Sequence, residues 1–183
     1  MTDIESEKVF FEDKVFHILD SVYKPAEDTF LLADNLSVKT GGIVLDVGTG
    51  CGILAILSAS KAKQVIALDL NPKAVICTQL NARINRLSEK TDVIRGDLFS
   101  PLRKKALFDL VIFNSPYLPT EKDKLKDWID YAWSGGEEGR EVINLFLKQV
   151  LGYLKPSGRI LIVQSTLSHV NKTLKKFSRQ GFD

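Results

Sequence analysis

Four consecutive residues, Asn114-Ser115-Pro116-Tyr117, have the types and spacing to act on a planar nitrogen group. The lone pair of an amide or aromatic amino nitrogen is delocalised, so that nitrogen is a poor nucleophile until acceptors hold both of its N–H bonds. The Asn114 side-chain oxygen and the Ser115 carbonyl are two such acceptors. Pro116 would stiffen the loop, and Tyr117 can stack on the planar group. The same residues are typical of a β-turn after a strand, so alone they leave both interpretations open.

A glycine-rich segment, Asp46–Gly52, follows a continuous apolar run and precedes a run typical of a helix. Glycine lets the backbone turn sharply and approach a ligand closely. Gly48, Gly50 and Gly52 have the spacing G-x-G-x-G, which differs from the dinucleotide fingerprint G-x-G-x-x-G and from a phosphate-binding P-loop. Asp46 favours a cationic ligand over a pyrophosphate. S-adenosylmethionine carries a sulfonium and an ammonium, and the loop therefore predicts it as the cofactor.

Two further carboxylates lie at the ends of the next two predicted strands. Asp69, beside Leu70, lies about twenty residues after the glycine loop, the interval of an acid that binds ribose hydroxyls. Asp97 can accept from an adenine amino group, with Leu98 against the ring. One glycine loop is often only a tight turn, and one Asp at a strand end is often a helix cap. Three such features on successive strand ends favour a cofactor site instead.

An alternation of apolar strands and helices predicts the frame that positions these residues. The predicted strands are 43–47, 65–70, 92–95, 108–113 and 159–164, and the predicted helices are 53–60, 72–84 and 140–154, the last followed by a turn at 155–158. Near-continuous apolar strands separated by helices indicate a parallel sheet covered on both faces. We expect one α/β domain over 1–183, with a hairpin and a helix in 1–40 ahead of a core in 41–183.

The two ends of the chain carry weaker patterns. Residues 8–19 contain two β-rich runs around Glu12-Asp13-Lys14, which predicts the hairpin, and Pro25 precedes the helix of the N-terminal segment. A helix is expected over Leu167–Arg179, after which Gly181-Phe182-Asp183 resembles the start of another strand.

Composition excludes several function classes. The chain has 183 residues, 44% of them hydrophobic, and a net charge of +2, which is too mild to indicate nucleic acid. Arg103-Lys104-Lys105 is expected to be a solvated turn. Cys51 and Cys77 lack the spacing of metal ligands, so we expect no metal and a reducing compartment. With no leader-like or membrane-spanning pattern, the sequence predicts a cytoplasmic protein.

Together the motifs resemble those of class I S-adenosylmethionine-dependent methyltransferases of the N-P-P-Y group, which have a Rossmann-like fold. The segments Tyr23–Thr29 and Ala132–Glu141 narrow the resemblance to HemK-type protein glutamine methyltransferases. The short archaeal and eukaryotic branch, which modifies the Gly-Gly-Gln loop of class 1 translation release factors, is the most similar. The resemblance extends from about Tyr23 to Gln164.

The resemblance implies roles for individual residues. Asn114 would grip the substrate amide, with Pro116 and Tyr117 shaping the slot. Trp133–Gly139 would border the substrate channel, where its glycines either permit closure or form a flexible connector. The implied cofactor contacts, joined to those inferred above, are Thr29, Asp46, Gly48, Gly50, Gly52, Asp69, Leu70, Asp97, Leu98 and Asn114. Trp128, Tyr131 and Trp133 are expected to be core residues rather than lid residues.

The resemblance also implies a partner, and the sequence departs from the family in two places. A small zinc-binding activator protein would dock on the edge strand Thr91–Arg95, with Val93 as an anchor.

Ser115 stands where the family has proline. The family sheet, ordered 3-2-1-4-5-7-6, has two strands after Gln164 that this sequence mostly lacks. Cys51 is expected to be a small apolar filler, and His17 and His169 are expected to be surface residues.

Three functions remain open from the sequence. The first is methylation of a glutamine side chain in a release factor. The second is methylation of an exocyclic amine of a DNA or RNA base, because the same Asn-x-Pro-Tyr chemistry serves both nitrogens. The third is a non-catalytic module that binds the cofactor or a partner.

Overall fold

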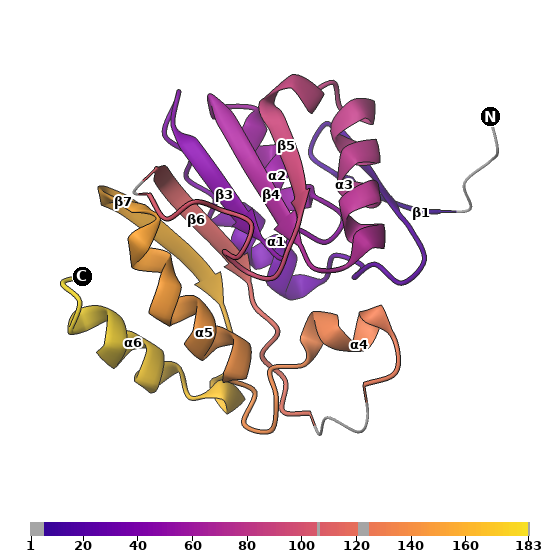
Figure 1. Cartoon of the computed structure of the whole chain (residues 1–183). Helices are drawn as coiled ribbons and strands as arrows, with labels where there is room; N and C mark the ends of the chain where they lie inside the picture. The colour runs from indigo at the N-terminus through magenta and orange to yellow at the C-terminus, as the bar shows by residue number, and fades with distance from the viewer. Residues whose placement is uncertain (1–5, 106, 121–124, 183) are drawn as a thin grey trace.

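A five-stranded parallel sheet with helices on both faces forms the centre of the protein (Figure 1). The structure is a computed structural model that describes residues 6–105, 107–120 and 125–182. The strand order is β5-β4-β3-β6-β7, with neighbours parallel throughout. The strands are β3 (Ile43–Val47), β4 (Gln64–Asp69), β5 (Thr91–Arg95), β6 (Phe108–Asn114) and β7 (Leu154–Val163). This order confirms the predicted α/β sheet and its 3-2-1-4-5 arrangement.

Helices cover the two faces of the sheet because successive side chains in each strand point to opposite sides. The helices are α1 (Glu27–Asp34), α2 (Ile53–Ala59), α3 (Pro72–Ile84), α4 (Trp128–Trp133), α5 (Glu141–Gln149) and α6 (Val170–Ser178). Val44 and Ile112 belong to the buried cluster that includes residues of α1, α2 and α3. Leu45 and Val111 belong to a second cluster with α5. Burial on both faces explains why these strands read as continuous apolar runs.

The predicted N-terminal hairpin consists of β1 (Glu7–Phe11) and β2 (Lys14–Ile18), with Glu12 in a left-handed backbone at the turn. It docks on α3 through Asn81, a fully buried side chain. The Asn81 oxygen accepts from the His17 backbone N–H at 2.8 Å, and its nitrogen donates to the His17 carbonyl at 2.7 Å. The same nitrogen donates to the Cys51 carbonyl at 2.8 Å. One amide thus joins the hairpin, α3 and the glycine loop.

The turn expected at Lys155–Gly158 is wrong, as is the end of the preceding helix. Helix α5 ends at Gln149, a 3-10 turn covers Val150–Gly152, and Lys155–Gly158 lies inside β7. Phe108 still pairs with Leu154, whereas Leu110 pairs with Arg159, so the register shifts. The strand accommodates proline and glycine because it is an edge strand of the described sheet and bulges there.

Helix α6 confirms the predicted C-terminal helix, and Gly181 and Phe182 after it belong to no strand of the described sheet. The Phe182 ring packs on Phe177 with centroids 5.3 Å apart, which turns the chain back on α6. Asp183 lies outside the described residues. The buried Arg140 guanidinium donates to the carbonyls of Ser168 and His169 and thereby ties the segment before α6 to α5.

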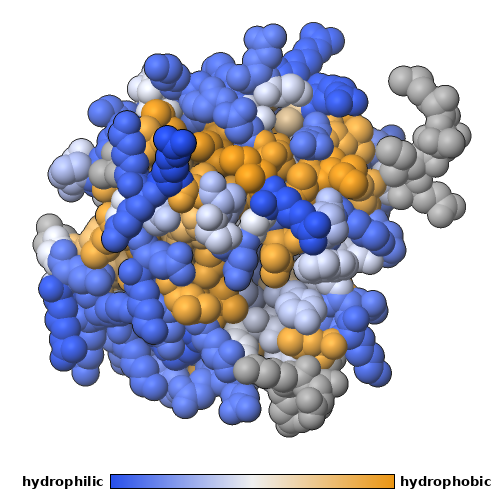
Figure 2. Space-filling model, in the orientation of Figure 1, coloured by the Kyte–Doolittle hydropathy of each residue, from blue (hydrophilic) through white to orange (hydrophobic). Residues whose placement is uncertain are grey.

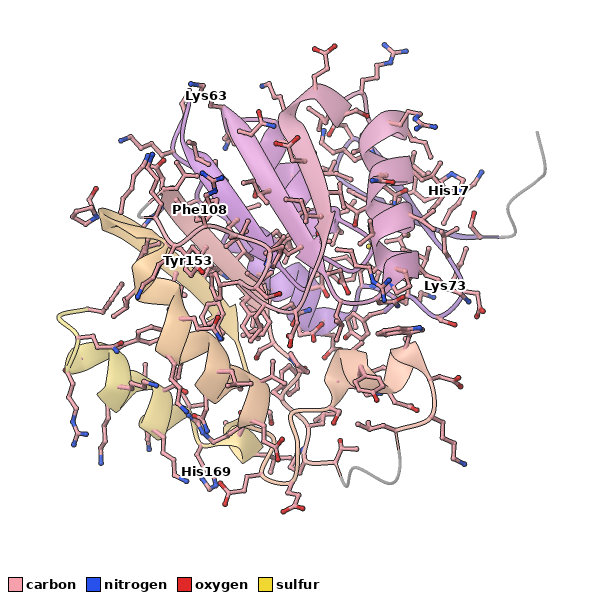
Figure 3. The ribbon with its side chains drawn as sticks, viewed as in Figure 1. His17, Lys63, Lys73, Phe108, Tyr153 and His169 are labelled. Atoms are coloured by element: carbon pink, nitrogen blue, oxygen red, sulfur yellow. The ribbon has the colours of Figure 1, made fainter. Side chains whose placement is uncertain are left out.

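The basic run after β5, the two cysteines and the two histidines lie as follows. Arg103, Lys104 and Lys105 are exposed, and Cys51 and Cys77 are free and buried. Figure 3 shows His17 beside α3 and His169 far away near α6; His169 is exposed and His17 is half-buried. Among the described residues, no group of three or more His, Cys, Asp or Glu is placed to hold a metal ion. In the same residues, no helix is both long and apolar enough for a membrane span.

Replacement of Asn81 by alanine tests its role in joining the three elements. The change leaves the His17 N–H and the Cys51 carbonyl without Asn81, whereas the His17 carbonyl keeps the hydrogen bond from the Cys77 thiol. Each buried unpaired group costs about 1–3 kcal/mol. We expect Asn81→Ala to lower the free energy of unfolding by about 3 kcal/mol in urea titrations. Asn171→Ala, the same change at an exposed position, is the control. Equal stability losses in the two variants would contradict the assignment.

Candidate active site

A cavity of about 330 Å³ opens at the carboxyl edge of the sheet, between the strand ends and α4. Its volume falls in the range of small-ligand sites. Ligands of open α/β sheets bind at this edge, where the loops after successive strands converge. The glycine loop after β3, the acid that ends β4 and the loop after β6 all line it.

Most of the predicted site residues meet at this cavity. Those that line it are Thr29, Gly48, Gly50, Asp69, Leu70, Asp97, Leu98, Asn114, Ser115, Pro116 and Tyr117. Two do not: Asp46 lies beneath the glycine loop, and Gly52 is the N-cap residue of α2. A Cβ at Gly52 would lie 2.7 Å from Thr78, so this glycine serves close packing. The expected direct contacts of Asp46 and Gly52 with the cofactor stay predictions, since neither residue is part of the cavity wall.

Asp46 supports the glycine loop from below. Its carboxylate accepts from the Thr49 hydroxyl at 2.7 Å, and the Thr49 N–H donates to the Leu68 carbonyl at 2.8 Å. Gly48 and Gly50 have φ values of 66° and 58°, a backbone that glycine adopts without steric cost. The loop therefore presents its backbone to the cavity while side chains behind it hold its shape.

Asp69 ties the same loop to the end of β4. One carboxylate oxygen accepts from the Gly50 N–H at 2.8 Å, and the other accepts from the Asn71 N–H at 2.9 Å. Each carboxylate oxygen has two lone-pair sites, so both retain capacity for ligand hydroxyls. Burial raises the pKa of Asp69.

Asp97 and Leu98 form the part of the wall that follows β5. Asp97 is exposed, and Leu98 has a left-handed backbone with φ 46°. Such a conformation costs free energy in a residue with a side chain and is held by its surroundings at functional sites. The pair places one carboxylate and one apolar side chain side by side, which suits a flat heteroaromatic ring with an amino group.

The loop after β6 is held in place by side chains on both sides. The Asn114 amide nitrogen donates to the Thr29 hydroxyl oxygen at 3.0 Å, which leaves the amide oxygen as the acceptor for a substrate. The Ser115 hydroxyl donates to the Val163 carbonyl at 2.6 Å and is 2% exposed. Ser115 thus tethers the loop to the end of β7, so the replacement of proline does not leave the loop unrestrained.

Two cavity residues of α4, Trp128 and Tyr131, were not predicted from the sequence, whereas Trp133 was expected to border the substrate channel. Trp128, Tyr131 and Trp133 line the cavity from α4, and Tyr131 and Trp133 are 50% and 40% exposed, so their expected place in the core is wrong. Tyr23 meets Trp133 edge-on, with ring centroids 5.7 Å apart. The Asp127–Asp130 capping box begins α4 and was the available signal for a short helix there.

The glycines before α5 serve packing against the loop after β6. A Cβ at Gly139 would lie 2.4 Å from the Tyr117 carbonyl oxygen, and one at Gly135 would lie 2.5 Å from Gly139. Leu118 bridges to Ser134, which joins the two segments. These contacts join Trp133–Gly139 to the loop after β6, and closure of this segment over a substrate stays a prediction.

The residues of the cavity fit S-adenosylmethionine. The glycine backbone permits close approach, the Asp69 and Asp97 carboxylates suit hydroxyl, amino and cationic groups, and Leu98 supplies an apolar wall. Fold and site together define a class I S-adenosylmethionine-dependent methyltransferase.

Comparison with known proteins identifies the family within that class. The family model "Methyltransferase small domain" matches residues 21–130. A Methanocaldococcus jannaschii protein named as a protein N5-glutamine methyltransferase is 38% identical over 163 residues, covering 88% of this chain and 81% of that protein. Human methyltransferase HEMK2 is 36% identical, with 87% and 79% covered. The release factor glutamine methyltransferase of Geobacter sulfurreducens is 30% identical, with 91% and 61% covered.

A solved structure agrees on the fold. The precorrin 8w decarboxylase of Methanobacterium thermoautotrophicum superposes with a TM-score of 0.68 at 24% identity, over 92% of this chain and 79% of that one.

The match to the family model and the identity to the named relatives show the family. The chain belongs to the methyltransferase small domain family and, within it, to the HemK-type methyltransferases. It is an enzyme whose cofactor is S-adenosylmethionine.

The buried Asp46 carboxyl predicts a pH-dependent stability. Burial, with the nearby Asp69 carboxylate adding to it, raises the pKa of Asp46 from 3.8 to about 7. Between these values the folded chain holds a proton that the unfolded chain has lost, so this group's contribution to stability falls as the pH rises. In urea titrations near pH 5 and near pH 8, we expect wild type to lose more stability on going to the higher pH than Asp46→Asn does.

Asp92→Asn, at an exposed position, should retain the wild-type pH dependence. Parallel pH profiles for wild type and Asp46→Asn would show that Asp46 does not titrate in this interval.

Proposed function

We propose that the protein transfers a methyl group from S-adenosylmethionine to the side-chain amide nitrogen of a glutamine in a class 1 translation release factor. The observation that carries the proposal is the orientation of Asn114. Its nitrogen is held by Thr29, and its oxygen is left to accept from a substrate amide in a cavity shared with the cofactor residues. The names of relatives as glutamine methyltransferases support the substrate class.

The residues of the loop after β6 would activate the amide. When bound, S-adenosylmethionine supplies a methyl group on a positively charged sulfur. The Asn114 side-chain oxygen and the Ser115 carbonyl accept the two N–H bonds of the glutamine amide, which turns the nitrogen lone pair toward that methyl group. Direct methyl transfer needs no covalent nucleophile on the protein. The chain would therefore accelerate the reaction by positioning the amide and by electrostatic stabilisation. Asn114 and Ser115 therefore must be held rigidly.

The aromatic residues around the cavity suit a planar amide. Tyr117, Tyr23 and Trp133 line the cavity, and the rings can contact the faces of a flat group while they exclude water. Water would compete for the acceptors on Asn114 and Ser115. An aromatic lining therefore favours a planar amide as the substrate group.

We also propose that a small zinc-binding activator protein docks on β5. This strand pairs only with β4 in the described sheet, so its outer edge is open to β-augmentation. Val93 and Ile94 are half-buried, and Ile76 of the adjacent α3 is 55% exposed. Figure 2 shows apolar side chains gathered over β5 and α3 on the face toward the viewer. An apolar partner surface would cover them.

The substrate is tested with labelled S-adenosylmethionine and three acceptors: a release factor, its Gly-Gly-Gln glutamine variant, and RNA. We expect label on the wild-type factor alone. Label on RNA would favour the base amino-methyltransferase alternative. Cofactor binding without label on any acceptor would favour a non-catalytic module.

Two variants separate catalysis from cofactor binding in the same assay. Asn114→Ala removes the amide acceptor, and we expect transfer to fall by at least about a hundredfold while cofactor affinity stays nearly unchanged. Asp69→Ala removes a carboxylate acceptor, and we expect cofactor affinity to fall about tenfold to a hundredfold. Calorimetry with S-adenosylhomocysteine measures the affinities. Loss of cofactor binding in Asn114→Ala would contradict its assigned role.

The activator is tested by co-expression with a small zinc-binding protein of that kind, followed by size-exclusion chromatography. Val93→Glu places a charge on the edge strand, and we expect the complex to dissociate. Asp92→Asn, a change of an exposed side chain on the same strand, should retain the complex. Separate elution of the two wild-type proteins, or an intact complex with Val93→Glu, would exclude this docking mode.

A further inference from the structure

Asp28, in the first turn of α1, receives hydrogen bonds from three sides of the cavity. The Tyr23 hydroxyl donates to it at 3.0 Å, and the Tyr117 hydroxyl donates at 3.0 Å from the loop after β6. The Thr29 hydroxyl donates to it at 3.1 Å, and the Thr29 backbone N–H at 2.6 Å. Thr29 in turn accepts from the Asn114 amide nitrogen at 3.0 Å. Asp28 is therefore the final acceptor of a network that ends at Asn114.

The direction of these hydrogen bonds follows from the charge of Asp28. An ionised carboxylate can only accept, so the Tyr117 and Thr29 hydroxyls must donate to it. A hydroxyl has a single proton, so Thr29 has none left for Asn114 and must accept from it. The Asn114 nitrogen then faces Thr29 and its oxygen faces the cavity. Without the carboxylate, the Thr29 hydroxyl could rotate and donate to the Asn114 oxygen, which would reverse the amide.

Both phenols remain donors over the neutral pH range. Burial, with the Asp28 charge as the next contribution, raises the pKa of Tyr117 to about 12 and raises that of Tyr23 as well. Asp28 lies in the first turn of α1, where the exposed N–H groups of the helix favour a negative charge. The network is thus stable in one direction, from Asn114 to Asp28.

We propose that Asp28 is a positioning residue that, through the Thr29 hydroxyl, fixes the Asn114 side chain with its oxygen toward the substrate amide. This inference rests on the proposed function, because the orientation matters only if Asn114 accepts from a substrate N–H. Tyr117 shares the same carboxylate, so the orientation of Asn114 and the position of the Tyr117 ring are coupled. Tyr23 extends this coupling to Trp133 on α4.

The transfer assay tests the proposal with two matched pairs. Thr29→Val removes the hydroxyl at nearly constant volume, whereas Thr29→Ser keeps it. Asp28→Asn removes the charge, whereas Glu27→Gln removes a neighbouring exposed charge of α1 that does not line the cavity. We expect kcat to fall about tenfold to a hundredfold in Thr29→Val and Asp28→Asn, with KM changed much less. Thr29→Ser and Glu27→Gln should stay near wild type.

Cofactor affinity and melting temperature are measured on the same variants. A purely structural role would lower the melting temperature in proportion to the loss of kcat, and a direct cofactor role of Thr29 would weaken S-adenosylhomocysteine binding in Thr29→Val. Either result would overturn the proposal. Rescue of kcat by Thr29→Ser, with affinity and melting temperature unmoved in Thr29→Val, would support it.

A second measurement needs no substrate. The side-chain amide protons of Asn114, assigned in nitrogen-15 spectra by their loss in Asn114→Ala, should exchange slowly with solvent in wild type and in Thr29→Ser. They should exchange faster in Thr29→Val and Asp28→Asn. If wild type fails to methylate glutamine, the proposed function fails, and the amide spectrum still decides the orientation. Equal exchange in all four proteins would overturn the proposal.

Discussion

The hydrogen bond between the Asn114 amide and the Thr29 hydroxyl is the interaction on which the site depends. It joins residues 85 positions apart in sequence, one at the end of β6 and one in the first turn of α1. The oxygen and the NH2 group of an asparagine side-chain amide are similar in size and shape, so steric fit alone does not decide which of them faces the cavity. The bond to Thr29 decides it, and the loop after β6 acquires a defined acceptor before any substrate arrives. Pre-organisation of this kind avoids reorganisation during the reaction.

The cofactor side of the cavity is organised by the same principle. Asp46 and Asp69 both bind the glycine loop, the first through the Thr49 hydroxyl and the second through the Gly50 N–H. Both are shielded from solvent, which raises the pKa of each carboxyl and makes its ionisation costly. A cationic ligand in the adjoining cavity would lower that cost. The protonation states of Asp46 and Asp69, which hold the glycine loop, would therefore respond to a cationic ligand in the cavity.

Sequence patterns predicted the sheet and most of the cavity, because strand ends of a parallel sheet converge at one edge whatever the details of the loops. The strand order and the places of Gly48, Asp69, Leu98 and Asn114 at the cavity follow from that rule. The patterns could not place Asp46 behind the loop, since its distance from the cavity depends on side-chain direction in β3. Nor could they place Trp128 and Tyr131 at the cavity, because aromatic residues in a short helix are equally typical of a core. The Lys155–Gly158 bulge depends on which strand lies at the edge.

The N-terminal segment was expected as a unit ahead of the core, and its contacts show how closely the two are combined. Leu32 of α1 is buried in the same cluster as Val44 of β3, and Asn81 binds the hairpin and the glycine loop together. Thr29 and Asp28 complete the cavity from the N-terminal side. Loosening α1 would therefore reduce core burial and free the Asn114 amide at once. Stability and orientation of the acceptor are linked because one helix provides both.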